Sequence, residues 1–91
     1  MKTQRNWGWY EVLAEGTGYK ILKLFVKPYK RTPLAFHMKH KEIWVFLYGE
    51  VKEIEAYVKH QFVNHSNKGV RFIEIQIGER IRYKKKEIID G

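Results

Sequence analysis

The chain has 91 residues, enough for one domain, and 44% of them are hydrophobic and 15% aromatic. It contains no cysteine, which excludes disulfide bonds and cysteine-ligated zinc sites. Its net charge of +8 favours anionic partners, such as nucleic acid, an anionic surface or a phosphorylated small molecule.

The beginning of the chain carries no targeting signal that we can identify. Residues 1–6 are polar and lack the apolar core of a signal peptide. No stretch approaches the roughly 18 consecutive apolar residues of a membrane span. We therefore expect a cytoplasmic protein with no membrane partner, in which residues 1–91 form a single domain.

Three segments have the alternating pattern of β-strands. Residues 21–26 present one apolar face and one mixed face, and residues 71–77 alternate in a similar way. Residues 43–48 are apolar on both faces, which predicts a central strand covered from two sides. Residues 50–58 form a weaker segment, which fits either a strand or a connection.

Residues typical of turns separate these segments. Glycine, proline and asparagine mark turns or loops at 15–18, 27–33 and 64–69, and Gly49 and Gly78 follow strand segments. No segment has a convincing helical period. Several short strands at this spacing predict an all-β sandwich or barrel.

The aromatic residues divide into two groups. Trp44 and Phe46 lie in the most apolar segment, and we expect them in the core. Trp7 and Trp9 are two residues apart, which would place them on one strand face, either at one end of the barrel or in a dimer contact.

Three motifs occur in order along the chain. Residues 5–13 read Arg-Asn-Trp-Gly-Trp-Tyr-Glu-Val-Leu, residues 42–49 read Glu-Ile-Trp-Val-Phe-Leu-Tyr-Gly, and residues 72–78 read Phe-Ile-Glu-Ile-Gln-Ile-Gly. They resemble motifs in the cupin domain of type II phosphomannose isomerases, which is often fused to a mannose-1-phosphate guanylyltransferase. The resemblance implies a small cupin barrel, an RmlC-like jelly roll.

The chain is shorter than that family in one place. Only ten residues separate Gly49 from His60, where family members have an additional hairpin. We therefore expect a cupin barrel lacking one hairpin. A partner chain could fill the gap, so we also expect a homodimer.

The resemblance also implies a divalent metal, either zinc, manganese, iron or nickel. The positions that match the family's ligands are His37, Glu42 and His60, and Asn64 follows His60 at the spacing of the second motif. The family has Gln and His where this chain has Ala35 and Lys39. His40 is a substitute ligand if the chain bends after His37.

The implied activity is that of a mannose-6-phosphate isomerase. A metal would polarise the sugar carbonyl while a base, which the sequence does not identify, moves a proton. Arg5, Arg31 and Lys39 are the candidate contacts to a sugar phosphate or a similar small anionic ligand.

Two alternatives remain open at this point. The first is a non-catalytic binding module for nucleic acid or a protein partner, which the charge of +8 suggests. The second is a cupin shell that has kept the fold without a ligand.

Overall fold

The computed structural model describes residues 1–36, 40–78 and 88–90, and every regular element within them is a strand. The strands are β1 (Lys2–Arg5), β2 (Gly8–Gly16), β3 (Tyr19–Val26), β4 (Leu34–Ala35), β5 (Lys41–Phe46), β6 (Val51–Ile54), β7 (Val70–Ile77) and β8 (Ile88–Asp90). The all-β prediction is confirmed. No helix in these residues could cross a membrane.

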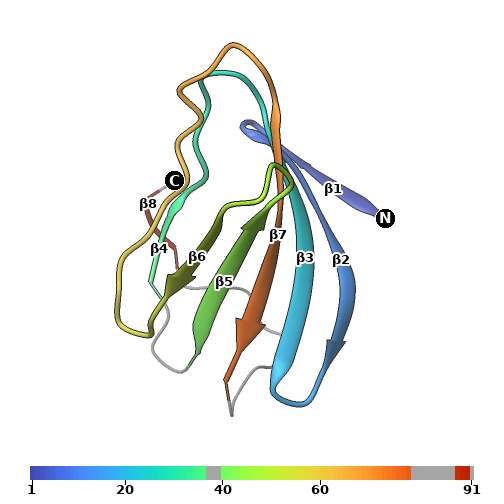
Figure 1. Cartoon of the computed structure of the whole chain (residues 1–91), viewed down its shortest axis with the longest axis vertical. Coiled ribbons are helices and arrows are strands. Elements are labelled where there is room, and N and C mark those ends of the chain that lie inside the picture. Colours follow the sequence, from blue (N-terminus) through green and yellow to red (C-terminus); the bar gives the residue numbers. More distant parts are fainter. Residues whose placement is uncertain (37–39, 79–87, 91) are drawn as a thin grey trace.

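Six strands form one antiparallel sheet in the order β1-β2-β3-β7-β5-β6 (Figure 1). β3 and β7 pair along their whole length, from Tyr19 opposite Ile77 to Val26 opposite Val70. β5 pairs with the other edge of β7. The strands predicted at residues 21–26 and 71–77 are therefore present, whereas the weaker segment contributes only the four residues of β6.

A second layer lies beside the inner face of this sheet. β4 pairs with β8, and the connection between β6 and β7 runs antiparallel to the segment that leads into β4. Backbone bridges join Arg31 to Val63 and Ala35 to His60. Figure 1 shows these segments side by side, which gives the molecule the shape of a small, partly open roll.

The core fills the space between the two layers. Phe62 comes from the second layer, and its ring lies 5.3 Å from that of Phe46 and 5.1 Å from that of Phe72. Burial of these rings supplies much of the driving force for folding in a domain this small. The buried hydrophobic cluster consists of Trp7, Leu22, Leu24, Val26, Trp44, Phe46 and Phe72.

Trp7 and Trp9 lie on different sides of the sheet, so the prediction that they share a face was wrong. Trp7 lies in the turn between β1 and β2, where the strand alternation is broken, and it is buried in the core. Trp9 faces outward and stacks on Phe25 at 5.7 Å. Between them, Gly8 has a φ of +151°, and a Cβ there would lie 1.8 Å from the Phe25 carbonyl oxygen.

The prediction that the segment 43–48 is covered from two sides was also wrong for the described residues. Trp44 and Phe46 face the core, as predicted. Ile43 and Val45 point to the other side, where they are only half buried because no described element covers that face. Tyr48 lies beyond the end of β5 and is 69% exposed.

Buried Asn64 connects the polar turn at 64–69 to the end of β3 by side-chain hydrogen bonds. Its side-chain amide lies 3.1 Å from the carbonyls of Val26 and Lys27 and 2.7 Å from that of Lys68. Its side-chain oxygen accepts hydrogen bonds from the amide and hydroxyl of Ser66. Asn64, the residue of the second motif, therefore has a structural role here.

Candidate functional site

Polar side chains gather at one end of the interior. Glu42 faces inward from the start of β5, and Gln76 is its cross-strand partner on β7. Half-buried Lys20 continues this row on β3, opposite Gln76. The next row along the same strands holds Leu22, Glu74 and Trp44, and the row after it, Leu24, Phe72 and Phe46, is wholly apolar. Polar side chains therefore occupy one end of the interior and apolar side chains the other.

Glu42 is the centre of this polar end. Its side chain is 1% exposed, and the indole Nε1 of Trp44 donates a 2.9 Å hydrogen bond to its Oε1. His60 Nε2 lies 3.3 Å from the same oxygen, and His40 Nε2 lies 3.7 Å from Oε2. Two imidazoles from different segments therefore meet one buried carboxylate.

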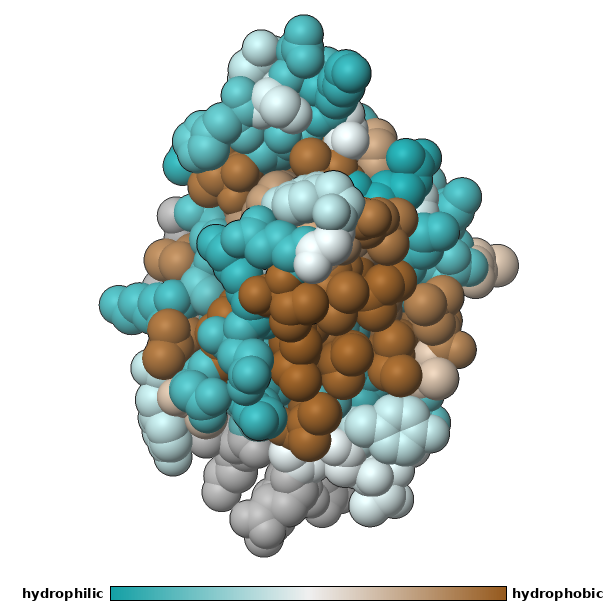
Figure 2. All heavy atoms as spheres, viewed as in Figure 1, coloured by the Kyte–Doolittle hydropathy of each residue, from teal (hydrophilic) through white to brown (hydrophobic). Residues whose placement is uncertain are grey.

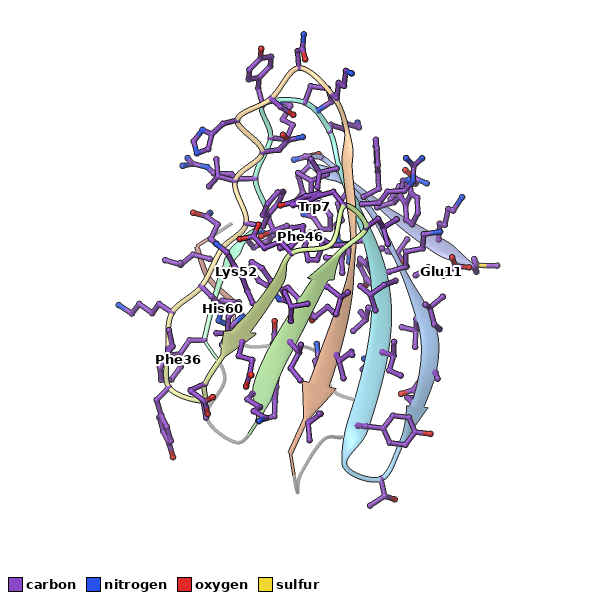
Figure 3. All side chains as sticks on the ribbon, in the orientation of Figure 1. Trp7, Glu11, Phe36, Phe46, Lys52 and His60 are labelled. Atoms are coloured by element: carbon purple, nitrogen blue, oxygen red, sulfur yellow. The ribbon has the colours of Figure 1, made fainter. Side chains whose placement is uncertain are left out.

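The second layer positions His60. Its backbone exchanges two hydrogen bonds with Ala35, of 2.9 and 3.0 Å. The ring Nδ1 lies 2.9 Å from the Val58 carbonyl oxygen, which directs Nε2 toward Glu42. Figure 3 shows His60 on the segment beside β4, away from the end where Trp7 and Phe46 gather.

The surroundings of His60 favour its protonated form. Burial opposes the charge, but the hydrogen bond and negative charge of Glu42, the Val58 carbonyl and the charge of Glu74 outweigh it. Together they raise the pKa of His60 above its ordinary value of 6.5. In the absence of a cation, an ion pair between His60 and Glu42 thus stabilises this arrangement.

A second carboxylate faces the same interior. Glu74 lies on β7, opposite Trp44 of β5, and is 3% exposed. It accepts a 2.6 Å hydrogen bond from Gln76 Nε2. Trp44, Glu74 and Gln76 were not among the predicted site residues. The signal was present in the sequence, because polar residues at 74 and 76 alternate with isoleucines along a strand.

The structure brings some of the predicted site residues together. Glu42 and His60 meet, and so does the substitute ligand His40. His37 and Lys39 lie outside the described residues.

The two arginines predicted to bind substrate are exposed. Arg5 lies on β1, at the opposite edge of the sheet from β6, and its guanidinium contacts Tyr10. Arg31 lies in the loop before β4, where its backbone pairs with Val63. Within the described part of the chain, the side chain of Arg5 contacts Gln4 and Tyr10 rather than Glu42 or His60.

The donor types at this end suit a divalent transition metal. Imidazole nitrogen and carboxylate oxygen are common ligands of zinc, manganese, iron and nickel. The contact of His60 Nδ1 with a backbone carbonyl is the kind of second contact that orients ligating histidines. Within residues 1–36 and 40–78, no three such side chains are already arranged to hold a metal ion. Glu42 and His60 thus fit as two ligands, and a third must be added.

The fold is that of a small cupin-like domain. The profile of the mannose-6-phosphate isomerase C-terminal family matches residues 1–57, and the chain belongs to that family. A search of curated protein sequences finds no match.

Solved structures with the same fold include several cupins. A cupin-2 domain protein from Rhodospirillum rubrum is 17% identical with a TM-score of 0.74, over 97% of this chain and 72% of that one. A cupin-superfamily sugar phosphate isomerase from Silicibacter pomeroyi is 16% identical with a TM-score of 0.65, over 79% of this chain and 60% of that one. The capsular polysaccharide assembling protein CapF from Staphylococcus aureus is 10% identical with a TM-score of 0.79, over 100% of this chain and 34% of that one. At these identities the likeness establishes the fold alone.

Proposed function

We propose that the polar end of the interior binds a sugar phosphate, or a similar small anion, together with a divalent metal. The observation that carries this proposal is the contact of His60 with buried Glu42, at 3.3 Å. Glu42 and His60 would hold the metal, and either His37 or His40 would complete its ligands. Membership of the mannose-6-phosphate isomerase C-terminal family supports the choice of ligand.

The charges at this end make the metal necessary for an anion to bind. Glu42 and Glu74 are both buried, and their carboxylates would repel a phosphate group at short range. A divalent cation beside Glu42 offsets that repulsion, and half-buried Lys20 adds a positive charge in the same cross-strand row. We therefore expect sugar-phosphate binding to require the metal.

The reaction that we propose is isomerisation of a sugar phosphate such as mannose 6-phosphate, in the cytoplasm. A bound metal would supply polarisation of the sugar carbonyl. Around it, the indole of Trp44 would hold the Glu42 carboxylate in place through its 2.9 Å hydrogen bond. The Val58 carbonyl would keep the Nε2 of His60 directed inward.

The test compares metal content and ligand binding in three proteins. The wild type, His60→Ala and His65→Ala are purified without a metal-binding tag, and their zinc, manganese, iron and nickel are measured by elemental mass spectrometry. His65 is the matched control, because it is exposed in the polar turn. We expect about one metal per chain in the wild type and His65→Ala, and none in His60→Ala.

Titration calorimetry with mannose 6-phosphate follows, with and without the metal, and then an isomerase assay. Binding that appears only with the metal supports the proposal. A wild type that takes up none of the four metals, even when they are supplied, refutes it. Binding without turnover would retain the site and remove the isomerase activity from the proposal.

A second candidate function is binding of single-stranded nucleic acid by the loops at the other end. Residues 27–33 and 61–69 contain four Lys or Arg residues and no Asp or Glu. Bridges and hydrogen bonds hold the two loops together, and they form the mostly hydrophilic lobe at the top of Figure 2. Within this lobe Tyr29 is 69% exposed with a φ of 59°, and such exposed aromatic rings stack on bases.

This candidate is tested with a fluorescent oligothymidylate. Lys27→Gln and Lys30→Gln together should weaken binding at least tenfold, while Lys52→Gln on β6 should leave it nearly unchanged. The affinity of the wild type should fall as salt rises, because phosphate contacts release counterions. Equal binding by all three proteins would remove this candidate.

A further inference from the structure

Glu74 carries a buried charge on a central strand of the sheet. β7 lies between β3 and β5, and Glu74 faces the interior between Leu22 and Trp44 in its cross-strand row (Figure 1). Among the described residues, Glu42 and Glu74 are the acidic side chains that are buried. Because Glu42 is the proposed metal ligand, Glu74 is the buried carboxylate that remains for another task.

The hydrogen bond that Glu74 accepts does not explain its charge. Gln76 Nε2 donates to Glu74 Oε2 at 2.6 Å. A glutamine at position 74 could accept the same bond through its amide oxygen and would bring no charge into the interior. A buried carboxylate is costly even when it is hydrogen-bonded. The hydrogen bond accounts for a polar residue at this position, and the negative charge points to a chemical use.

Glu74 lies within reach of a small molecule held at Glu42 and His60. It is two residues along β7 from Gln76, the cross-strand partner of Glu42. Two residues of an antiparallel strand span about 7 Å, which is the length of a few bonded carbon atoms with their oxygens. The negative charge of Glu74 is also close enough to His60 to act on it. A sugar whose carbonyl lies at Glu42 and His60 can therefore present the neighbouring carbon to Glu74.

The other ionisable groups at this end have different tasks. Glu42 and His60 are the proposed metal ligands. His40 Nε2 lies 3.7 Å from Glu42 Oε2, which places His40 on the metal side of the interior. The ammonium group of half-buried Lys20 has hydrogen-bond donors and no acceptor, so it cannot take a proton. Glu74 is the remaining group that can act as a base.

We propose that Glu74 is the base that moves the proton during isomerisation, a catalytic residue that contacts the sugar phosphate beside its carbonyl. This inference rests on the proposed function. Glu74 takes the proton from C2 of open-chain mannose 6-phosphate, the C2–H electrons form the C1=C2 bond, and the carbonyl electron pair moves to the C1 oxygen. The proton of the C2 hydroxyl passes to the C1 oxygen. The C2 carbonyl then forms, and the C1=C2 electrons take the proton back from Glu74 at C1. Protons and electrons balance without a co-reactant.

The test compares metal content, mannose 6-phosphate binding and isomerisation in the wild type, Glu74→Gln and Glu74→Asp. Glu74→Gln keeps the shape of the side chain and removes its charge. We expect it to hold as much metal as the wild type and to bind mannose 6-phosphate at least as tightly, because a repelling carboxylate is gone. Its turnover should fall by about a hundredfold or more. Glu74→Asp keeps a carboxylate, although a shorter one, and should turn over faster than Glu74→Gln.

Glu55→Gln is the matched control, since it makes the same change at an exposed residue after β6, and it should behave like the wild type. Circular dichroism checks that all variants are folded. Turnover in Glu74→Gln close to that of the wild type, or above that of Glu74→Asp, overturns the inference and leaves the proposed function intact. Loss of metal or of binding in Glu74→Gln also overturns it, because Glu74 would then hold the metal or the ligand.

Failure of the proposed function gives a different result, because it appears in the wild type. A wild type that binds no mannose 6-phosphate in the presence of metal refutes the site as a whole. A wild type that binds it without turnover overturns the base together with the isomerase activity.

Discussion

The carboxylate of Glu42 shows how one side chain can set the chemistry of an otherwise aromatic interior. It is almost completely buried and receives an indole N–H from Trp44. A buried carboxylate is costly unless it has hydrogen bonds and a cationic partner. His60 supplies that partner in the metal-free protein, and a metal ion would compete with the proton for the same Nε2 atom.

The pKa of His60 should report this competition. In metal-free protein, we expect Glu42→Gln to lower the pKa of His60. The negative charge that favours the protonated ring is then removed, while burial still favours the neutral ring. A ring-proton titration by NMR measures it in both proteins. An unchanged pKa in Glu42→Gln would contradict the contact at 3.3 Å.

The raised pKa of His60 also has consequences for stability and metal binding. The folded protein binds the proton of the His60 ring more tightly than the unfolded chain does. Protonation of His60 therefore contributes its full stabilisation below about pH 6.5. That contribution is lost as the pH rises through the raised pKa. Metal binding has the opposite dependence, because it needs the neutral imidazole, and it should weaken as the pH falls through the same range.

Asn64 is the residue whose loss should cost the most stability outside the core. Asn64→Ala removes hydrogen bonds to the carbonyls of Val26 and Lys68 and to the backbone of Ser66. We expect the free energy of unfolding to fall by about 3 kcal/mol, measured by urea denaturation. Asn67→Ala in the same turn is exposed and should cost little. Equal losses in both variants would contradict a structural role for Asn64.

At the scale of elements, sequence patterns predicted the strands better than the direction of their faces. Alternation at residues 71–77 identified β7, but the isoleucine face points outward while Phe72, Glu74 and Gln76 face the interior. Hydrophobicity alone would have placed the isoleucines in the interior and Phe72, Glu74 and Gln76 on the outward face. The family motifs located Glu42 and His60, whereas the contribution of Glu74 depends on which face is inside. Contacts between segments far apart in sequence, such as Ala35 with His60, have no local pattern that predicts them.

The turn between β1 and β2 depends on a glycine. Gly8→Ala would place a Cβ 1.8 Å from the Phe25 carbonyl oxygen, so β2 and β3 would have to separate near buried Trp7. We expect a loss of about 2 kcal/mol or more in the free energy of unfolding. Gly49→Ala is the control, because Gly49 also has a positive φ but no atom lies within 4 Å of its added Cβ. A smaller loss for Gly8→Ala than for Gly49→Ala would show that the clash is relieved at low cost.

At the scale of the whole molecule, acidic and basic groups are segregated. The interior site has two buried carboxylates, whereas the lobe formed by residues 27–33 and 61–69 has only basic charged residues. The outward face of the six-stranded sheet, where Ile21, Ile43 and Ile75 point away from the core, belongs to neither region. The three regions therefore suit different partners: a cation suits the interior site, an anion suits the lobe, and an apolar surface suits the outward face of the sheet.

This segregation predicts that a chelator and salt will act on different binding events. Removing the metal with a chelator should abolish binding of mannose 6-phosphate, because Glu42 and Glu74 would then repel the phosphate. The same treatment should leave oligothymidylate binding at the lobe unchanged, since that contact needs only exposed Lys and Arg side chains.

Raising the salt concentration should weaken oligothymidylate binding. The logarithm of the affinity should fall with the logarithm of the salt concentration, with a slope of about 0.7 for each phosphate neutralised. Titrations of both probes under both treatments provide the measurement. Loss of both ligands on chelation would mean that they share one site, and the separation of the two ends would be wrong.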